Sequence, residues 1–385
     1  MTTSPVVPFV DLSKQHTPLQ PKLMAAIAAV VERGDYILGD AVSQFEQTFA
    51  AACNTNLGVG VGSGTDALTL GLKACSIGPG DQVILPVNTF VATLIGVLQA
   101  GATPVFVDCE LNTGLMDLTA AERAINGKTR AIVPVHLYGQ MVSPYALRNL
   151  VADRDIIIFE DAAQAHGAKR EGVTAGSIGL AAAFSFYPSK NLGAMGDSGM
   201  VVTQEELVAQ TVRSLRNYGS TRKYYHTDPG GTNSRLDTLQ AAILQIKLPQ
   251  LAAWNRDRNQ LAKLYDQALA PLARYGLVPM ENQSGSGHVY HLYVIRLTDD
   301  CPIDRTELQH ILSTHGIQSG IHYPVPCHLQ PAFHDLKYQS GDFPKAEALS
   351  QQILSLPMYP GMHEDQLAYV VETINKQLQP SPVLI

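Results

Sequence analysis

Lys190 is the side chain with the clearest chemical potential in this sequence. It stands alone among small and polar residues in segment 183–193, after a short apolar run that predicts a strand. A lysine amine withdrawn from water can act as a nucleophile toward a carbonyl carbon, and it can later carry a proton between two carbon atoms. Because most lysines are only solvated surface charges, Lys190 needs support from other residues.

Two adjacent carboxylates, Glu160 and Asp161, end the apolar run 156–159. A carboxylate at the end of such a strand can face a pyridine nitrogen and keep it protonated, so that the ring accepts electrons during proton removal. We assign this role to Asp161 and expect Glu160 to face the opposite side as a structural group. Capping of a following helix by Asp161 explains the same residues equally well.

A glycine-rich turn at 61–68 leads from an apolar strand into a helix and predicts a phosphate cradle. The spacing of Gly62, Gly64 and Ala67 also fits a dinucleotide fingerprint, and an ordinary strand-to-helix turn is commoner than either. A nicotinamide site would need an acidic residue at the end of the next strand, and segment 83–88 has none. A phosphate turn, a strand-end acid and a loop lysine, in this order, indicate pyridoxal 5'-phosphate (PLP).

The elements that must position these residues alternate between strands and helices, which predicts an α/β fold with a mostly parallel sheet flanked by helices. The predicted strands are 83–86, 103–108, 131–136, 156–160, 182–186 and 200–203, and the helices between them are 66–74, 89–100, 118–125 and 144–153. Later segments predict helix over 236–269, interrupted at Pro249, a strand at 290–297, and helices at 305–315 and 365–378. We expect a large PLP-binding domain at 1–250 and a small C-terminal α+β domain at 251–385.

The composition excludes several other classes. With 385 residues and 45% hydrophobic content the chain can bury a large core, and a net charge of −7 without clustered cations argues against nucleic acid. The sequence 1–13 lacks a targeting pattern and no apolar run is long enough to span a membrane, so we expect a cytoplasmic protein. Five scattered cysteines favour no disulfide framework, and neither they nor the histidines have metal-ligand spacing, so no metal is expected.

Motifs along nearly the whole chain resemble the DegT/DnrJ/EryC1/StrS family of nucleotide-sugar aminotransferases, which have the aspartate-aminotransferase-like PLP fold type I. The matching segments are 8–12, 34–39, 63–68, 88–90, 160–164, 185–190, 216–219, 233–237 and 322–324. The resemblance implies a transaminase whose PLP cycles through pyridoxamine 5'-phosphate.

The resemblance also implies the roles of individual residues. Lys190 forms the Schiff base and Asp161 pairs with the ring nitrogen. Phe90 stacks on the ring, and Gln164 bonds its phenolic oxygen. The residues implied at the cofactor phosphate are Ser63, Gly64, Thr65, Ser185 and Asn233, and those implied at the sugar are Tyr187, His322 and Tyr323.

Asn233 is expected to reach the cofactor of a neighbouring subunit, which implies a homodimer with shared active sites. Without the resemblance, a loop amide capping the next helix is the preferred reading of Asn233.

The implied reaction moves an amino group, with L-glutamate as the expected donor, to a keto-sugar carried by a nucleotide. Segments 185–194 and 196–199 are similar to members that aminate C-3 of dTDP-3-keto-6-deoxyhexoses. A UDP-linked 3-keto N-acetyl sugar and a 4-keto sugar nucleotide stay open as acceptors. The alternatives from other classes are a non-catalytic PLP-binding regulator and a nicotinamide oxidoreductase.

Overall fold

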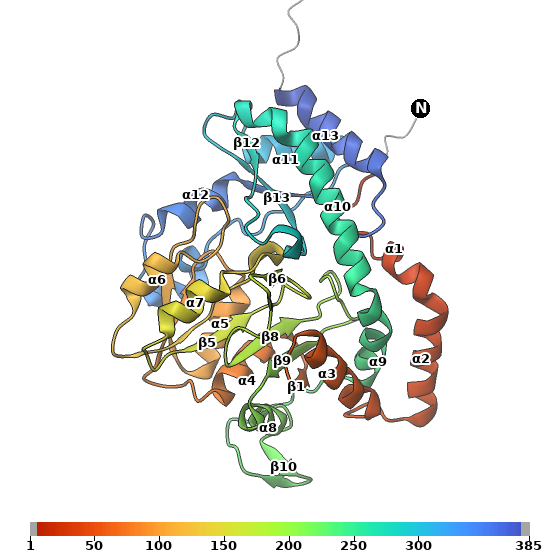
Figure 1. Ribbon diagram of the computed structural model, residues 1–385, viewed down its shortest axis with the longest axis vertical. Coiled ribbons are helices and arrows are strands. Elements are labelled where there is room, and N and C mark those ends of the chain that lie inside the picture. The colour runs from red at the N-terminus through yellow and green to blue at the C-terminus, as the bar shows by residue number, and fades with distance from the viewer. Residues whose placement is uncertain (1–5, 379–385) are drawn as a thin grey trace, which may run out of the picture.

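The computed structural model describes residues 6–378, and its main feature is a seven-stranded sheet (Figure 1). Across the sheet the strands are β1 (Leu57–Val61), β9 (Gly199–Thr203), β8 (Ala181–Ser185), β5 (Ile157–Asp161), β4 (Thr129–Ile132), β2 (Gln82–Pro86) and β3 (Thr103–Val107). The last five are parallel to one another, and β9 runs antiparallel to both of its neighbours. The predicted α/β class with a mostly parallel sheet is confirmed.

The predicted strand at 131–136 is wrong at its end, since β4 stops at Ile132. Pro134 has no amide hydrogen to donate to a ladder, so regular pairing cannot continue through it. Beyond it only an isolated bridge joins Val135 to Asp161. That bridge still draws the segment toward the end of β5.

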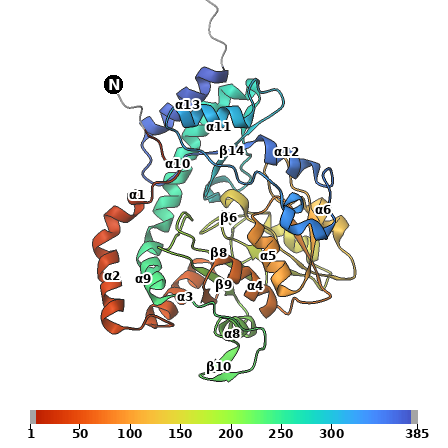
Figure 2. The ribbon, with the colours of Figure 1, turned by 180° about the vertical axis from the view of Figure 1, so that it is seen from behind.

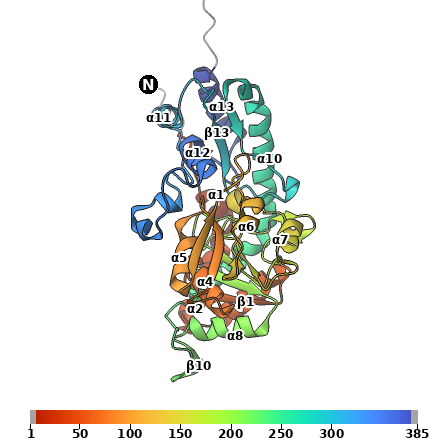
Figure 3. The same cartoon turned by 90° about the vertical axis from the view of Figure 1, so that its left-hand side faces the viewer.

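The strands of this sheet are almost entirely buried because helices cover both of its faces. They are α4 (Gly64–Ala74), α5 (Val91–Ala100), α6 (Leu118–Ala124), α7 (Pro144–Val151) and α8 (Glu206–Leu215). In the side view, α5 and α7 lie on opposite sides of the sheet (Figure 3). The helix predicted at 89–100 begins only at Val91 in the structure, because the backbone of Phe90 is extended and this residue is the N-cap of α5.

Two long N-terminal helices, α2 (Gln20–Arg33) and α3 (Asp40–Ala52), were not predicted. They follow α1 (Ser13–His16), and both pack against α9 (Thr238–Lys247), as Figure 2 shows for α2. Leu23 of α2 shares a small apolar cluster with Ile243 and Trp254. The N-terminal segment is thereby fixed beside the sheet.

The second unit is built on a three-stranded antiparallel sheet of β12 (Leu277–Pro279), β13 (Tyr293–Leu297) and β14 (Ile353–Leu356). Its helices are α10 (Leu251–Leu269), α11 (Arg305–Thr314), α12 (Pro344–Gln352) and α13 (Glu364–Leu378). It lies at the opposite end of the molecule from α8 and the hairpin of β10 (Ser220–Arg222) and β11 (Tyr225–His226) (Figure 1). Among residues 6–378, no helix has the length and apolar character needed to cross a membrane.

The predicted domain boundary at residue 250 falls in the turn Leu248–Gln250 between α9 and α10, and it stays a prediction. Two segments cross it. Val7 pairs with Ile317 and is buried in the core of the second unit. In the other direction, Asp108 at the end of β3 accepts the amides of Lys345 and Ala346 at the start of α12.

Candidate active site

A cavity of about 450 Å³ gathers nearly all the site residues predicted from the sequence. It opens at the carboxyl ends of β5 and β8, where ligands bind in open parallel sheets. The predicted residues that line it are Ser63, Gly64, Thr65, Phe90, Asp161, Gln164, Ser185, Tyr187, Lys190, His322 and Tyr323. Asn233 is the one predicted residue that does not line it.

Lys190 lies in a tight loop after β8 that aims its amine into this cavity. The loop is closed by a bond from the Ala194 amide to the Phe186 carbonyl, over 2.8 Å. Lys247 fixes its far end by donating to the carbonyl of Gly193. Burial lowers the pKa of Lys190 to about 8, and the nearby Asp161 carboxylate acts in the opposite direction. A neutral, nucleophilic amine is therefore far more accessible here than on a surface lysine.

Asp161 is buried at the end of β5, with one protein donor on each carboxylate oxygen. Its Oδ1 accepts the Ala163 amide over 3.1 Å, and its Oδ2 accepts the Thr93 hydroxyl over 2.7 Å. Burial raises the pKa of Asp161, and both hydrogen bonds oppose that rise. Because no helix begins after Asp161, the capping interpretation is excluded.

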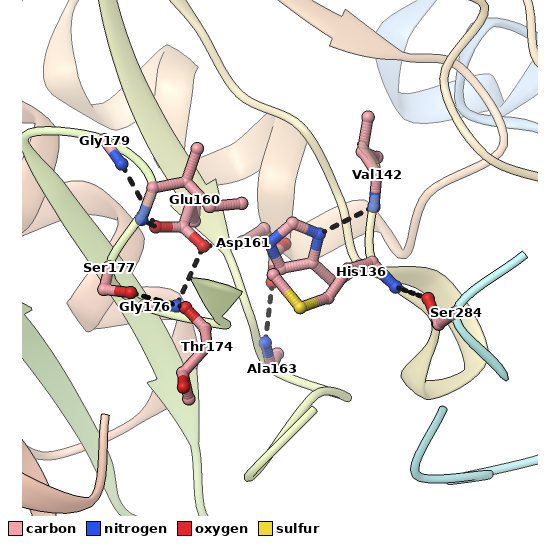
Figure 4. Close-up of polar contacts among 12 residues, drawn as sticks. His136, Val142, Glu160, Asp161, Ala163, Thr174, Gly176, Ser177, Gly179 and Ser284 are labelled. Atoms are coloured by element: carbon pink, nitrogen blue, oxygen red, sulfur yellow. Dashed lines mark hydrogen bonds and ion pairs between the residues drawn. The ribbon is translucent and has the colours of Figure 1, made fainter. Parts of the chain in front are cut away.

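Glu160 has a different set of partners, as Figure 4 shows. Its carboxylate accepts the amides of Gly176 and Ile178 over 2.8 and 2.7 Å, and it lies 2.9 Å from Nε2 of His136. The Nδ1 atom of that imidazole accepts the Val142 amide, so its proton is on Nε2 and is donated to Glu160. Glu160 thus holds a buried turn in place.

The predicted phosphate cradle is the N-terminus of α4. Ser63 caps the helix by accepting the Asp66 amide over 3.1 Å, while the amides of Gly64 and Thr65 have no protein acceptor among the described residues. A Cβ at Gly64 would lie 2.5 Å from the Cβ of Ser185, so only glycine permits this approach of the two backbones. The free amides of Gly64 and Thr65 and the hydroxyls of Thr65 and Ser185 line the same cavity, and such donors suit an anion.

Between the cradle and Lys190, three side chains form a slot for a flat ring. Phe90 is half exposed at the cavity, and its ring centroid lies 5.3 Å from that of Tyr323. Gln164 accepts the Tyr138 amide through Oε1 over 2.6 Å, which leaves Nε2 to donate to the Tyr323 hydroxyl over 3.1 Å. The amide donor of Gln164 is therefore on the cavity side.

His322 forms part of the wall contributed by the second unit. Its imidazole stacks on Phe9 with 5.7 Å between ring centroids, and its Nδ1 lies 2.8 Å from the Ser355 hydroxyl. Burial lowers its pKa to about 4, with Lys190 adding to the shift. A neutral imidazole at this position can exchange hydrogen bonds with hydroxyl groups.

Sequence reasoning gave no site role to several residues at the cavity, among them Thr89, Thr93 and His291. Thr89 and His291 line the cavity, and the Thr93 hydroxyl donates a hydrogen bond to the Asp161 carboxylate. Two threonines four residues apart where an apolar run begins were a usable signal for Thr89 and Thr93, although Thr89 lies before α5 and only Thr93 is in the helix. His291 has no such pattern around it.

Asn233 is exposed and pairs by a backbone bridge with Asn217. It does not cap α9, whose N-cap is Asp237. The next residue, Ser234, donates to Asp66 over 2.8 Å and accepts the Gly62 amide. These bonds place the Asn233 loop beside the phosphate cradle, with its side chain free to meet another molecule.

The residues fit pyridoxal phosphate in three separate respects. The free amides of α4 suit its phosphate, the slot between Phe90 and Gln164 suits its ring, and the amine of Lys190 shares the cavity with the buried carboxylate of Asp161. Each feature meets a different part of one cofactor.

Comparison with known proteins gives the same answer. Residues 19–375 match the DegT/DnrJ/EryC1/StrS aminotransferase family. The dTDP-3-amino-3,4,6-trideoxy-alpha-D-glucose transaminase of Streptomyces venezuelae is 44% identical over 97% of this chain and 96% of that protein. The UDP-N-acetyl-3-dehydro-alpha-D-glucosamine 3-aminotransferase of Acidithiobacillus ferrooxidans is 41% identical over 98% and 100%. A pleiotropic regulatory protein of Geobacillus stearothermophilus is 43% identical over 96% and 97%.

Among solved structures, S. venezuelae DesV in complex with a ketimine intermediate superposes with a TM-score of 0.93, at 43% identity, over 98% of this chain and 100% of DesV. The chain therefore belongs to the DegT/DnrJ/EryC1/StrS family and is a PLP-dependent aminotransferase with the fold that the sequence predicted.

Proposed function

We propose that this enzyme transfers an amino group from L-glutamate to C-3 of a dTDP-3-keto-6-deoxyhexose, giving a dTDP-3-amino-3,6-dideoxyhexose. The observation that carries the proposal is the convergence of Lys190, Asp161 and Gln164 on one cavity, in a chain 44% identical to a dTDP-3-amino sugar transaminase. When bound, pyridoxal phosphate supplies an electron sink and holds the amino group as pyridoxamine phosphate between the two half-reactions.

The protein contributes proton transfer and electrostatic control. Lys190, with its pKa lowered to about 8, takes a proton from the donor carbon and returns one to the cofactor side. Asp161 would keep the ring nitrogen protonated, and Gln164, whose Nε2 donates to the Tyr323 hydroxyl, would offer this donor to the phenolic oxygen of the cofactor. Ser63, Gly64, Thr65 and Ser185 hold the phosphate.

The sugar enters beside the aromatic and imidazole groups at the mouth of the cavity. Tyr187 is 54% exposed there and can fold over a hexose ring. His322 and Tyr323 present a neutral imidazole and a phenol to its hydroxyl groups. Such groups select a substrate by hydrogen bonds that a differently substituted sugar leaves unpaired.

The working unit in this proposal is a homodimer with shared sites. Within residues 6–378, Lys190 is the sole cationic side chain that lines the cavity, although a glutamate carboxylate and two phosphates need positive or hydrogen-bonding partners. The exposed Asn233, beside the cradle of its own subunit, is available to the cofactor phosphate of the partner. A second subunit would complete both sites at once.

A UDP-linked 3-keto N-acetyl sugar is the second candidate acceptor, because a relative of that activity is 41% identical. A regulator without catalysis is the reading suggested by the Geobacillus relative, and the complete set of Lys190, Asp161 and Gln164 argues against lost chemistry.

The test is a panel of 3-keto and 4-keto sugars on dTDP and UDP, with glutamate as donor and mass spectrometry of the products. Amination of only 4-keto sugars, or of none, would refute the proposed substrate.

A further inference from the structure

Thr93 is a buried neighbour of the active site. It lies in the first turn of α5, three residues after Phe90, and none of its surface is exposed. Its hydroxyl donates to Oδ2 of Asp161 over 2.7 Å. In a helix a threonine hydroxyl ordinarily turns back to the carbonyl four residues earlier, so this outward bond is a specific contact.

A second hydroxyl lies behind the first. Thr89 Oγ1 is 2.7 Å from Thr93 Oγ1, and both residues are buried. A hydroxyl has one hydrogen, and an ionised carboxylate can only accept. While Asp161 is ionised, the hydrogen of Thr93 must therefore point at Asp161, and Thr89 must donate to Thr93.

This directed pair solves a problem that burial creates for Asp161. A carboxyl group surrounded by apolar atoms is driven toward its neutral form, which could no longer hold a proton on the ring nitrogen. The other charged or titratable neighbours are Lys190 in the loop after β8, His136 beyond β4, and the phenol of Tyr323. Lys190 changes its bonding and protonation during turnover, so its charge near Asp161 is not constant, whereas the Thr93 hydroxyl is a constant donor.

We propose that Thr93, supported by Thr89, is a positioning residue that holds the Asp161 carboxylate ionised and oriented toward the ring nitrogen of the cofactor. The inference rests on the role proposed for Asp161. It does not depend on which sugar is the acceptor.

The experiment uses the full-length apoprotein and ¹⁵N-labelled pyridoxamine 5'-phosphate. Isothermal titration calorimetry gives the dissociation constant, and the ¹⁵N resonance of the bound ring reports whether its nitrogen is protonated. The variants are Thr93→Val, which replaces the hydroxyl by a methyl group of similar size, Thr93→Ser, which keeps the hydroxyl, and Asp161→Asn. Thr373→Val is the matched control, because Thr373 is also helical and buried and its hydroxyl donates to the Tyr369 carbonyl over 2.8 Å.

We expect Thr93→Val to weaken binding by roughly tenfold to a hundredfold, the factor for a lost hydrogen bond to a charged group, and to move the ring resonance toward the unprotonated position. Thr93→Ser should restore both quantities, and Thr373→Val should change neither. An unchanged resonance in Thr93→Val would refute the inference, and so would a failure of Thr93→Ser to restore it.

The variants Asp161→Asn and Thr89→Val distinguish the ways in which the inference could fail. If Asp161→Asn moves the resonance and Thr93→Val does not, the inference about Thr93 is wrong and the role of Asp161 stands. If neither moves it, the role of Asp161 is wrong as well. Should Thr93→Val fail to fold, Thr89→Val tests the same chain from one hydroxyl further away, with a smaller shift of the same sign expected and no shift counting against the proposal.

Discussion

Glu160 and Asp161 are neighbours in the chain, yet their carboxylates bind unrelated groups on opposite faces of β5. Side chains alternate along a strand, so one carboxylate points to the turn at Gly176 and His136 while the other points to the cavity and Thr93. Figure 4 shows the separate partners, with Glu160 beside Gly176 and Asp161 beside Ala163. This division leads to different expectations for the two positions.

The structural carboxylate should control stability. We expect Glu160→Gln to lower the free energy of unfolding by about 2–4 kcal/mol, because one amide oxygen cannot replace two carboxylate oxygens that accept three backbone amides and an imidazole. Chemical denaturation of the apoprotein measures it. Asp155→Asn, just before the same strand, removes a surface pair with Arg130 and should change stability by less than about 0.5 kcal/mol. Equal effects of the two substitutions would contradict the assignment.

Lys190→Ala should abolish turnover and the absorbance of the Schiff base with the protein, because no other lysine amine of residues 6–378 lines the cavity. Pyridoxamine phosphate should still bind, since the cradle and Asp161 remain. Borohydride reduction of the wild-type protein with pyridoxal phosphate, followed by peptide mapping, gives an independent measurement. A label on any lysine other than Lys190 would overturn the assignment.

Asp161→Asn should preserve the fold and lower kcat on the order of 10²- to 10³-fold, the range seen when one preorganised charge is removed from an active site. The single oxygen of the amide can still accept the Ala163 amide, and its NH2 group can donate to the Thr93 hydroxyl, but the side chain carries no charge to hold the ring proton. Single-turnover kinetics with glutamate measure the effect on the first half-reaction. Near-normal rates would show that the ring nitrogen is held by another group.

The lowered pKa of Lys190 predicts how cofactor capture depends on pH. Only the neutral amine attacks an aldehyde, so with a pKa of about 8 the rate at which apoprotein captures pyridoxal phosphate should rise about tenfold from pH 7 to 9 and then level off. Nα-acetyl-lysine under the same conditions corrects for titration of the aldehyde, and its rate should still be rising at pH 9. A protein rate that parallels the acetyl-lysine rate would refute the shift.

Mixed dimers test whether Asn233 acts across the interface. A protomer with Lys190→Ala paired with a protomer with Asn233→Ala has one site that carries both changes and one that carries neither, if Asn233 serves the partner. We expect activity near half of the wild-type dimer, well above either parent. If Asn233 acts in its own subunit, every site carries one change and no activity is regained.

The sequence predicted which residues line the cavity where those residues form short local patterns. The turn at Ser63 and Gly64, the strand end at Asp161 and the loop at Lys190 are local patterns, and the structure brings them to one cavity because parallel strands end at the same edge. Strand alternation also predicted that Glu160 and Asp161 would face opposite sides of the sheet, but alternation alone does not say which of them faces the cavity.

The parts that were missed depend on contacts between distant segments. Thr93 meets Asp161 across 68 positions of sequence, and nothing around Thr93 names its partner. The strands β12 and β14 are three and four residues long, too short for periodicity to reveal them, and both are held by pairing with β13. Tertiary packing selects these elements, so a local pattern cannot predict them.

The crossing segments at Val7 and at Asp108 limit how substrates can enter. Val7 is anchored in the core of the smaller unit, and α12 of that unit is capped by Asp108 at the edge of the larger sheet. A wide hinge opening would have to pull both anchors out of buried or hydrogen-bonded positions. Admission of a bulky nucleotide sugar should therefore rely on rearrangement of exposed side chains such as Tyr187 at the entrance, while the two halves of the cavity keep their spacing.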